Sequence, residues 1–337
     1  MKQFNYCVFI GRFSIFHKGH QAILKQAFSI AEKVIVVIGS AGSARTVRNP
    51  WTLSERSEMI TESLSVEDQS NLTIIGMKDY TYNDNMWVSV IQEKINQATN
   101  YDGKVALIGY ESDETSFYLH LFPQFTYIEH GTEYSFHATD IRDLYFSNNL
   151  SYKNMVPDNI FSFLEKFREA DCYPALKQEK DYIDKYKKSW ENAPFPPIFV
   201  TVDNLILKSG HLLLIKRGHN PGKGLFALPG GFVNPKEKLI DAALRELKEE
   251  TKIKVNIPEL KKSITDYKVF DDPMRSSRGR VISHTYLINL GSGQLPLIKA
   301  GDDAAGAMWI PLSDYYTMED KFFEDHFHII RNMISKF

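Results

Sequence analysis

The chain has 337 residues, of which 43% are hydrophobic and 24% are charged, and its formal net charge is -2. This composition is typical of a globular protein long enough for two domains, and the small net charge excludes a broad basic field that would attract nucleic acid. Two cysteines, Cys7 and Cys172, exclude a disulfide framework. No signal peptide is visible, and no apolar run approaches the roughly 20 residues that span a bilayer. We therefore expect a cytoplasmic protein with no nucleic-acid or membrane partner.

Segments typical of strands and helices alternate through the first half of the chain. This alternation predicts a parallel sheet with crossover helices, so we assign residues 1–150 to an α/β domain. The expected strands are 6–10, 34–39, 72–76 and 105–109, and the expected helices are 21–31, 53–63 and 87–98.

The chain between residues 151 and 197 differs in composition from the segments on either side. It is helical and rich in charge up to about residue 192, and Ala193–Pro197 is then typical of a stiff, proline-rich linker. We therefore expect residues 151–197 to be a connecting segment and residues 198–337 to form a second domain. Strand-like runs open that domain, at 198–202, 205–208 and 211–217.

The run Gly11–His20 follows the first expected strand and opens the first helix. Free backbone N–H groups and the helix dipole attract an anion to a helix N-terminus, and His17 and His20 add imidazole donors there. A lone pair of histidines at this spacing is more often structural or metal-binding, but here Gly-Arg-Phe precedes it. The run resembles the H-x-G-H signature of the nucleotidyltransferase superfamily. This implies catalytic roles for His17 and His20, and contacts to ATP and its phosphates for Gly11, Arg12, Phe13 and Gly19.

A second segment, His137–Arg142, lies at the start of the helix expected after the last strand of the first domain. It resembles the closing I-S-x-T-x-I-R motif of the same superfamily, with Phe136 and His137 in place of the usual Ile-Ser pair. The resemblance implies that Thr139 binds phosphate and that Arg142 has a catalytic role, gripping the β- and γ-phosphates as a charged fork. Without the two upstream histidines, the segment would indicate only a capped helix with an exposed arginine.

Two stretches between these motifs indicate the second substrate. Arg45–Arg56 contains Asn-Pro-Trp-Thr-x-x-Glu-Arg and Asn83–Val88 contains a Trp-Val pair, and both resemble nicotinamide mononucleotide (NMN) adenylyltransferases of the archaeal type. In those enzymes the tryptophan stacks on the nicotinamide ring, which places a cation over an aromatic face. The alternative is that Trp87 is a core or helix-surface aromatic, and the residue that meets the carboxamide stays open between Asp84 and its two asparagine neighbours. The resemblance places NMN against Asn49, Asp84, Asn85 and Trp87.

The run Gly231–Ile253 matches a pattern of widely spaced residues, G-x5-E-x7-R-E-U-x-E-E-x-G-U with U aliphatic, at every position but one. Its second half has a helical pattern, and Glu246, Glu249 and Glu250 lie at i, i+3 and i+4 on one face. Three clustered carboxylates repel one another unless a cation lies between them, and hard oxygen ligands suit Mg²⁺ or Mn²⁺. The alternative is a solvated acidic helix face. The run resembles the Nudix box of hydrolases, with Lys252 in place of its glycine.

This second resemblance implies metal-assisted hydrolysis of a nucleoside diphosphate linked to another group. Glu246, Glu249 and Glu250 are then both catalytic residues and metal ligands. Arg245 is placed to hold Glu249 at i+4. Lys252 is expected to strain the end of the helix, because glycine adopts the left-handed conformation more readily than lysine does.

The stretch Val269–His284 follows the Nudix helix and is rich in arginine. It resembles a stretch of the ADP-ribose pyrophosphatases that are fused to these adenylyltransferases. Three arginines within six residues suit a diphosphate and its terminal ribose, so Arg275, Arg278 and Arg280 are expected to bind ADP-ribose. The alternative is an exposed basic hairpin. Further along, Asp302-Asp303 is a candidate base or additional metal ligand.

Taken together, the chain resembles the bifunctional NMN adenylyltransferase/Nudix hydrolase family over nearly its whole length. The expected fold is α/β, with an N-terminal Rossmann-like parallel-sheet nucleotidyltransferase domain and a C-terminal α+β Nudix domain. The implied function is AMP transfer from ATP to NMN, giving NAD⁺ and pyrophosphate, together with hydrolysis of ADP-ribose to AMP and ribose 5-phosphate, with Mg²⁺ or Mn²⁺ as cofactor. Two alternatives stay open: a Nudix half that senses ADP-ribose or NAD⁺ without hydrolysing it, and an N-terminal half that adenylylates another phosphate acceptor. The sequence also leaves open whether the chain forms a homo-oligomer.

Overall fold

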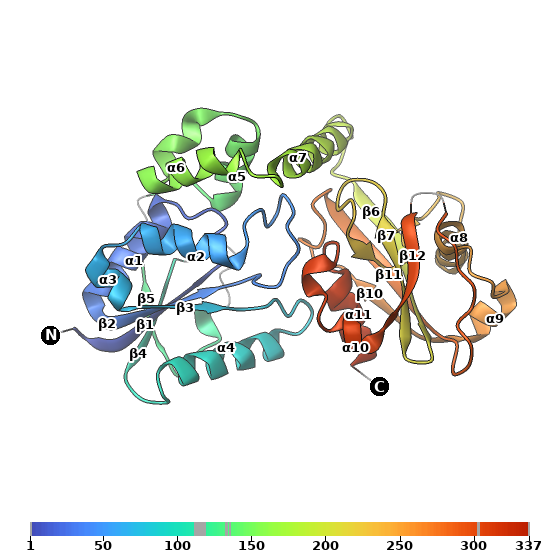
Figure 1. Cartoon of the computed structure of the whole chain (residues 1–337), viewed down its shortest axis with the longest axis horizontal. Coiled ribbons are helices and arrows are strands. Elements are labelled where there is room, and N and C mark those ends of the chain that lie inside the picture. The colour runs from blue at the N-terminus through green and yellow to red at the C-terminus, as the bar shows by residue number, and fades with distance from the viewer. Residues whose placement is uncertain (1, 111–118, 132–133, 135, 302–303, 336–337) are drawn as a thin grey trace. The chain divides into compact units, whose positions relative to one another are not determined.

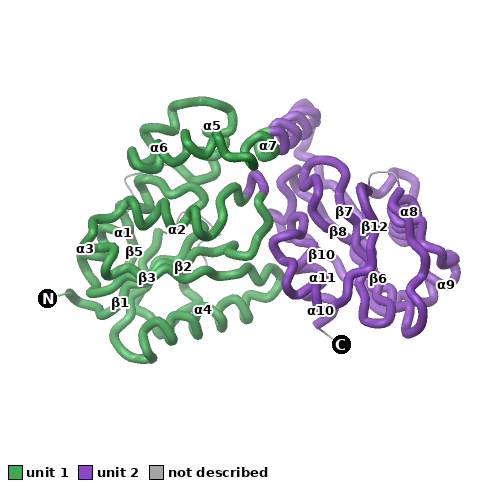
Figure 2. The backbone as a smooth tube through the Cα atoms, viewed as in Figure 1, with its two compact units in different colours: residues 1–45, 49–177 green, residues 46–48, 178–337 purple. Residues whose placement is uncertain are grey.

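The computed structural model describes residues 2–110, 119–131, 134, 136–301 and 304–335 (Figure 1). The chain divides into two compact units (Figure 2). Their boundary falls within the expected connecting segment, inside helix α7 (Tyr173–Lys188). Asp302-Asp303, which we considered as a base or metal ligand, lies outside the described residues. Unit 1 is Met1–Arg45 and Asn49–Lys177, and unit 2 is Thr46–Arg48 and Gln178–Phe337.

Strands and helices alternate along unit 1, as predicted. Its elements are β1 (Phe4–Gly11), α1 (Lys18–Ile30), β2 (Ala31–Ile38), α2 (Leu53–Glu62), α3 (Val66–Ser70), β3 (Leu72–Gly76), α4 (Asp84–Ala98), β4 (Val105–Gly109), β5 (Thr126–Glu129), α5 (Ala138–Phe146), the 3-10 helix η2 (Leu150–Met155) and α6 (Asp158–Phe167). The five strands are parallel, in the order β3-β2-β1-β4-β5. The strand order reverses at β1, and open α/β sheets bind ligands at the carboxyl ends of the strands at such a reversal.

Alternate side chains of β1 point to opposite faces of this sheet. Val8 and Ile10 pack with Ile91 and Ile95 of α4, whereas Phe9 lies beside His20 of α1, with ring centroids 6.0 Å apart. In Figure 1, α4 covers one face of the sheet and α1 and α2 cover the other. Because both faces are covered, the central strands are continuous apolar runs, which is the pattern that located them in the sequence.

Unit 2 contains a mixed sheet and confirms the predicted second domain fold. Its elements are β6 (Ile198–Lys208), β7 (His211–Arg217), β8 (Phe226–Ala227), β9 (Gly230–Phe232), α8 (Leu239–Thr251), α9 (Ile257–Lys262), β10 (Ile264–Phe270), β11 (Arg280–Asn289), β12 (Ala304–Pro311), α10 (Leu312–Tyr315), the 3-10 helix η3 (Glu319–Lys321) and α11 (His326–Ile334). The main order is β10-β11-β6-β7-β12, with β8 paired to β7 and β9 paired to β6. Strands β6 and β11 are parallel, and the other pairs are antiparallel.

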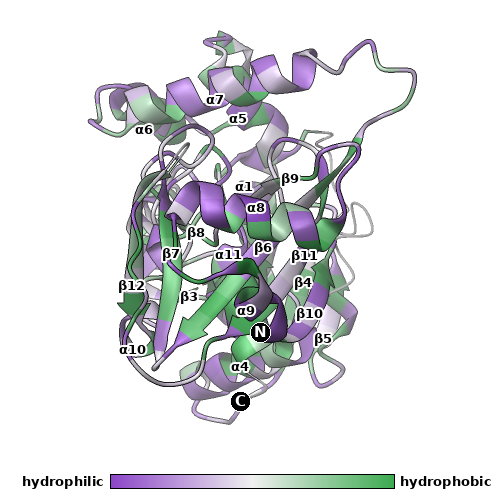
Figure 3. Cartoon of the chain, turned by 90° about the vertical axis from the view of Figure 1, so that its right-hand side faces the viewer, coloured by the Kyte–Doolittle hydropathy of each residue, from purple (hydrophilic) through white to green (hydrophobic). Residues whose placement is uncertain are grey.

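Helix α8 is amphipathic and packs on the sheet of unit 2 through its apolar side. Leu244 and Leu247 lie against Ile206 of β6 and Leu213 of β7, and hydrophilic and hydrophobic stretches alternate along the helix in Figure 3. Helices α8 and α11 lie on opposite sides of this sheet (Figure 1). The packing therefore leaves the charged side of α8 facing away from the core. None of the helices within the described ranges has the length and apolar character needed to cross a membrane.

Strand β6 is continuous, whereas we expected two strands with a break after Val202. The residues at the expected break, Asp203 and Asn204, are buried polar side chains. Asn204 Nδ2 donates to the backbone carbonyls of Pro229 at 3.1 Å and Ala243 at 2.8 Å, and Asp203 accepts a hydrogen bond from a serine hydroxyl of β11. Polar residues that resemble a turn in the sequence are thus accommodated inside a strand, because partners distant in the sequence accept hydrogen bonds from Asn204 Nδ2 and donate one to Asp203.

Two candidate active sites

The turn after β1 brings two histidines into contact at the start of α1. The rings of His17 and His20 are stacked, with centroids 3.6 Å apart and an interplanar angle of 22°. His17 Nδ1 accepts the backbone N–H of His20, and His20 Nδ1 accepts the backbone N–H of His17, each at 3.4 Å. Because both Nδ1 atoms accept hydrogen bonds, each neutral ring carries its proton on Nε2. Each ring can therefore donate an Nε2–H group to an anion.

The surroundings of this pair keep both rings uncharged at neutral pH. Burial, together with the charge of His137, lowers the pKa of His17 to about 4. Burial and the charge of His17 hold the pKa of His20 well below its ordinary value. Phe13 contributes to this burial, because its ring centroid lies 4.9 Å from that of His20. The histidines are thus neutral donors until a bound anion favours their charged forms.

The predicted phosphate-binding residues converge on the same turn. Arg142 of α5 has only 8% of its surface exposed, and its guanidinium donates to the Ser14 carbonyl and, at 3.0 Å, to Thr139 Oγ1. Arg142 therefore links the start of α5 to the turn after β1. Arg12 in that turn and Thr139 are exposed. The turn is tightly packed, because a Cβ on Gly19 would lie 3.1 Å from the His17 ring, and one on Gly11 2.9 Å from the Phe13 ring.

Arg56 of α2 organises the same edge of the sheet and was not identified from the sequence as a site residue. It is only 2% exposed, and it donates to the backbone carbonyls of Arg12 (2.7 Å), Gly39 (2.7 Å), Ser40 (3.1 Å) and Thr52 (3.3 Å). Burial lowers the pKa of Arg56 to about 10, which leaves it charged at neutral pH. The hydrogen bonds of Arg56 therefore link the residue that follows the end of β1 to the residue that follows the end of β2. The signal in the sequence was the arginine that ends the Asn-Pro-Trp-Thr-x-x-Glu-Arg stretch.

The residues expected at NMN lie in two segments of unit 1. Asn49 is half-buried in the loop before α2, and Asp84 and Asn85 are exposed in the first turn of α4. Asn83 caps α4, because its Oδ1 accepts a backbone N–H from the first turn at 3.1 Å. Trp87 is half-buried and packs against the hydrophobic core beneath α4. Both interpretations of Trp87, ligand-stacking and packing, therefore fit its position.

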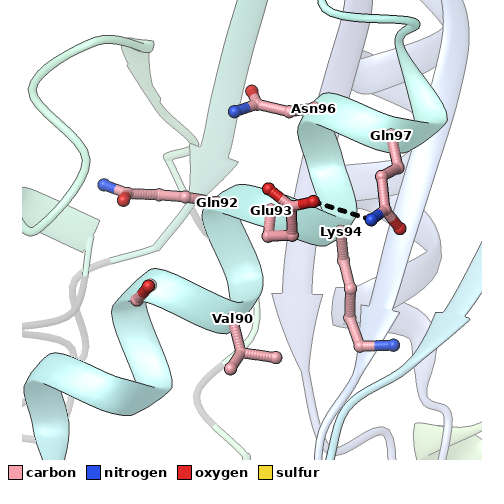
Figure 4. Close-up of a pocket in the computed structure, with 7 residues that line it drawn as sticks. Val90, Gln92, Glu93, Lys94, Asn96 and Gln97 are labelled. Atoms are coloured by element: carbon pink, nitrogen blue, oxygen red, sulfur yellow. Dashed lines mark hydrogen bonds between the residues drawn. The ribbon is translucent and has the colours of Figure 1, made fainter.

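A hollow along α4 is separate from these residues. Glu93 and Gln97 are bonded at 2.7 Å within it, and all of its lining residues come from this one helix (Figure 4). It includes none of the motif residues, so we assign no function to it. The lining residues are Ser89, Val90, Gln92, Glu93, Lys94, Asn96 and Gln97.

In unit 2, Arg245 organises the charged side of α8. Its Nε and Nη2 atoms donate to the two carboxylate oxygens of Glu237, each at 2.9 Å. Its Nη1 atom donates to Glu246 Oε1 at 2.8 Å and to Glu249 Oε2 at 2.9 Å. The predicted contact between Arg245 and Glu249 is confirmed. One guanidinium thus offsets the repulsion among three carboxylates.

Glu250 is buried, and its Oε2 accepts the backbone N–H of Gly230 at 2.9 Å. Burial raises the pKa of Glu250 to about 8, and burial also raises the pKa of Glu246. Over the described part of the chain, no three His, Cys, Asp or Glu side chains are arranged to hold a metal ion. Glu246, Glu249 and Glu250 share a helix face without converging, because two of them are bonded to Arg245. Their chemistry still fits a divalent cation, which would favour the ionised form of buried carboxylates.

The two ends of the Nudix run have constrained backbones. A Cβ on Gly231 would lie 2.5 Å from Glu246 Oε1, so this position accommodates the carboxylate only as glycine. At the other end, Lys252 adopts φ 44° and ψ 28°, and its N–H donates to the Lys248 carbonyl. The expected left-handed strain at Lys252 is confirmed.

The three arginines that follow β10 have different surroundings. Arg275 is buried, and its Nε and Nη2 atoms donate to the two oxygens of Asp325, each at 2.9 Å. Arg278 is half-buried, with its Cζ atom 5.2 Å from the ring centroid of Phe232. Arg280 is half-buried and donates to a backbone carbonyl of the preceding loop. Arg275 is thus paired with Asp325 in the fold, and its expected contact with ADP-ribose stays a prediction.

Comparisons with known proteins match both halves of the chain. The family model described as Cytidylyltransferase-like matches residues 8–144, and the NUDIX domain model matches residues 197–333. The nicotinamide/nicotinic acid mononucleotide adenylyltransferase of Acinetobacter baylyi is 34% identical over 180 residues, which is 53% of this chain and 95% of that protein. The ADP-ribose pyrophosphatase of Methanocaldococcus jannaschii is 42% identical over 133 residues, which is 40% of this chain and 71% of that protein.

Solved structures match the chain from end to end. A bifunctional NMN adenylyltransferase/ADP ribose pyrophosphatase from Francisella tularensis, crystallised with AMP and a Mn ion, is 35% identical with a TM-score of 0.93, and 99% of each chain is covered. A second crystal structure of a protein of that description from the same organism is 34% identical with the same TM-score and coverage. The similarity therefore includes the segment that connects the two halves.

Proposed function

Because the chain belongs to the family of bifunctional NMN adenylyltransferase/ADP-ribose pyrophosphatases, we propose that it has both activities. Unit 1 transfers AMP from ATP to NMN, giving NAD⁺ and pyrophosphate. Unit 2 hydrolyses ADP-ribose to AMP and ribose 5-phosphate. The observation that carries this proposal is the presence, on one chain, of the stacked histidine pair at the end of β1 and the three carboxylates on one face of α8.

In unit 1, a phosphate oxygen of NMN attacks the α-phosphorus of ATP. The bond from that phosphorus to the bridging oxygen breaks, and pyrophosphate leaves. The attacking phosphate is already anionic, so no side chain has to remove a proton. His17 and His20 donate their Nε2–H groups to the phosphates, and Arg142 supplies a positive charge where negative charge accumulates. The remaining contacts to ATP come from Gly11, Arg12, Phe13, Gly19 and Thr139.

The acceptor is NMN, held by Asn49, Asp84, Asn85 and Trp87. The positive nicotinamide ring gains from stacking on the half-buried indole of Trp87. Trp87→Ala should therefore lower NMN turnover and leave ATP binding in place. NAD⁺ formation at saturating ATP, measured against NMN concentration, gives the first quantity, and calorimetry with ATP gives the second. Unchanged NMN kinetics in Trp87→Ala would contradict the stacking of the nicotinamide ring on Trp87.

In unit 2, Glu246, Glu249 and Glu250 would hold a divalent cation, Mg²⁺ or Mn²⁺, which would polarise a phosphoryl oxygen and lower the pKa of an attacking water. Water attacks a phosphorus of ADP-ribose, the bond to the bridging oxygen of the diphosphate breaks, and AMP and ribose 5-phosphate leave. Arg245 orients two of the three carboxylates. Arg278 and Arg280 contribute positive charge for the diphosphate.

The test for unit 2 separates hydrolysis from sensing. The purified protein is incubated with ADP-ribose and Mg²⁺, then with Mn²⁺, and AMP is measured by chromatography. Glu250→Gln is the matched control, because the amide oxygen can still accept the Gly230 N–H while the charge is lost. AMP that forms with the native protein and not with the variant supports hydrolysis. ADP-ribose binding by calorimetry, with no AMP under either metal, would identify a sensor.

A further inference from the structure

The loop between β10 and β11, residues 271–279, is anchored by a carboxylate from near the end of the chain. Glu324 Oε1 accepts hydrogen bonds from Ser276 Oγ at 3.0 Å, Ser277 N at 2.9 Å and Ser277 Oγ at 3.2 Å. Glu324 itself has φ 44°, a left-handed conformation that residues other than glycine seldom adopt. Three donors on one carboxylate oxygen stabilise this strained backbone.

Ser276 connects this anchor to Arg278. The hydroxyl of Ser276 donates to Glu324, and its oxygen accepts both the backbone N–H and the Nε–H of Arg278, each at 3.4 Å. The guanidinium of Arg278 then lies over the ring of Phe232, with Cζ 5.2 Å from the centroid. Phe232 directly follows the glycine that abuts Glu246 Oε1. These contacts therefore lead from Glu324 through Ser276, Arg278 and Phe232 to the neighbourhood of Glu246 on α8.

Arg278 and Glu250 both act electrostatically on Arg217. Burial lowers the pKa of Arg217, and the charge of Arg278 lowers it further, whereas Glu324 and Glu250 raise it. A guanidinium that stacks on a ring keeps its in-plane N–H edge directed outward, and that edge matches the geometry of phosphate oxygens. Arg278 is thus connected through Phe232 and its neighbour Gly231 to Glu246 of α8, and its guanidinium has the chemistry of a phosphate ligand.

We infer that Glu324 is a positioning residue for the Nudix site, acting through Ser276 to hold Arg278 over Phe232, where the guanidinium binds a phosphate of the nucleoside-diphosphate substrate. This inference rests on the proposed function of unit 2 and adds a residue that neither the Nudix box nor the arginine-rich stretch contains. Glu324 does not touch the substrate. Its effect on binding depends on Arg278.

The first variant is Glu324→Gly, which removes the carboxylate and also relieves the left-handed strain. The KM for ADP-ribose should rise about tenfold, because a misplaced Arg278 contributes less to binding, while kcat stays within about twofold. Ser209→Gly is the matched control, because Ser209 is left-handed at φ 47° in the turn before β7 and takes no part in this chain of contacts. Its KM should equal that of the native protein. Thermal unfolding of each variant checks that it is folded.

A double-mutant cycle with Arg278→Ala tests whether Glu324 acts through the arginine. If it does, the Glu324→Gly/Arg278→Ala double variant has the same KM as Arg278→Ala alone. Glu324→Gln keeps an oxygen acceptor for Ser276, so its KM should lie between the native value and that of Glu324→Gly. A purely structural anchor would instead give effects on KM that multiply in the double variant.

The inference is overturned if the KM of Glu324→Gly stays within about twofold of the native value, or if the two substitutions act independently in the cycle. The native protein is assayed first, so a failure of the proposed function is seen separately, as an absence of AMP. In that case the same variants are compared by the Kd for ADP-ribose in calorimetry. An unchanged Kd in Glu324→Gly overturns the positioning role, and a Kd raised about tenfold supports it.

Discussion

Replacing Gly231 by alanine should disable the Nudix site and leave the protein folded. The new methyl group would lie 2.5 Å from Oε1, 2.6 Å from Cδ and 2.8 Å from Oε2 of Glu246. These atoms form the far end of a flexible side chain, so the clash is relieved by rotating the carboxylate and not by moving the backbone. The carboxylate that leaves its place is one of the three proposed metal ligands.

The expected loss of AMP release in Gly231→Ala follows from the distances around Gly231. An ordinary contact between these heavy atoms is about 3.5 Å, so the carboxylate of Glu246 has to move by about 1 Å. A displacement of that size costs about 100-fold in rate, which corresponds to about 2.7 kcal/mol of activation free energy. The free energy of unfolding should fall by about 1 kcal/mol or less, at the low end of overpacking effects.

Gly230→Ala is the contrasting control. A Cβ on Gly230 would lie 2.1 Å from the Val202 carbonyl oxygen and 2.9 Å from Asp203 Cα, both in the backbone of β6. No rotamer relieves that contact, so the pairing of β9 with β6 is lost. Overpacking of about 3 kcal/mol lowers the melting temperature by about 10 °C in a unit of this size.

The assay for both variants combines AMP release from ADP-ribose with thermal unfolding, and NAD⁺ synthesis by unit 1 serves as the internal reference. Gly231→Ala should lose about 100-fold in AMP release with a nearly native melting temperature, and Gly230→Ala should melt about 10 °C below the native protein. A displaced Glu246 carboxylate is ruled out if Gly231→Ala keeps AMP release within about fivefold of the native rate, or if the variant unfolds as early as Gly230→Ala.

Three further predictions concern stability. Lys252→Gly should raise the free energy of unfolding by about 0.5–1 kcal/mol, because left-handed strain of about 1–2 kcal/mol exceeds the entropy of about 0.5–1 kcal/mol that glycine adds to the unfolded chain. Urea denaturation measures the change, and a decrease would contradict the strain. Arg56→Lys should destabilise the protein by about 2–3 kcal/mol and reduce NAD⁺ synthesis, since one ammonium cannot reach the separate carbonyls that the guanidinium bonds. AMP release from ADP-ribose by unit 2 is the control. An equal loss of AMP release and NAD⁺ synthesis would show that the substitution does not act on unit 1 alone. The pKa of His17 is about 4 in the folded protein and ordinarily 6.5, so the unfolded chain binds a proton at His17 before the folded protein does. Lowering the pH from 6.5 towards 4 should therefore reduce the free energy of unfolding by about 3 kcal/mol. His17→Asn should flatten that dependence in denaturation at several pH values, and an unchanged slope would refute the assignment.

The parallel sheet of unit 1 could be predicted from the sequence because its central strands are buried on both faces. Continuous apolar runs such as 34–39 are a local signal of that burial. The continuous strand β6 could not be predicted. Asp203 and Asn204 interrupt its apolar pattern, and their buried hydrogen-bond partners lie between 25 and 80 residues away.

In the candidate sites, too, contacts between residues close in the sequence could be predicted, whereas contacts between distant residues could not. The spacing of Arg245 and Glu249 fixes their contact, because positions i and i+4 of a helix are neighbours. The strain at Lys252 could likewise be expected from its place in the Nudix run. In contrast, the buried pair between Arg275 and Asp325 spans 50 residues, and no periodic pattern connects them. A local motif identifies residues of the right chemical type, and only the fold separates those that face a ligand from those that face one another.

The proposed function assigns two separate active sites to one chain. The direct measurement is to assay a single preparation for NAD⁺ synthesis from ATP and NMN and for AMP release from ADP-ribose, in the native protein, in Glu250→Gln and in His20→Ala. We expect both activities in the native protein, loss of AMP release alone in Glu250→Gln, and loss of NAD⁺ synthesis alone in His20→Ala. AMP release that persists in Glu250→Gln, or a single substitution that removes both activities from a folded protein, would contradict the proposed function.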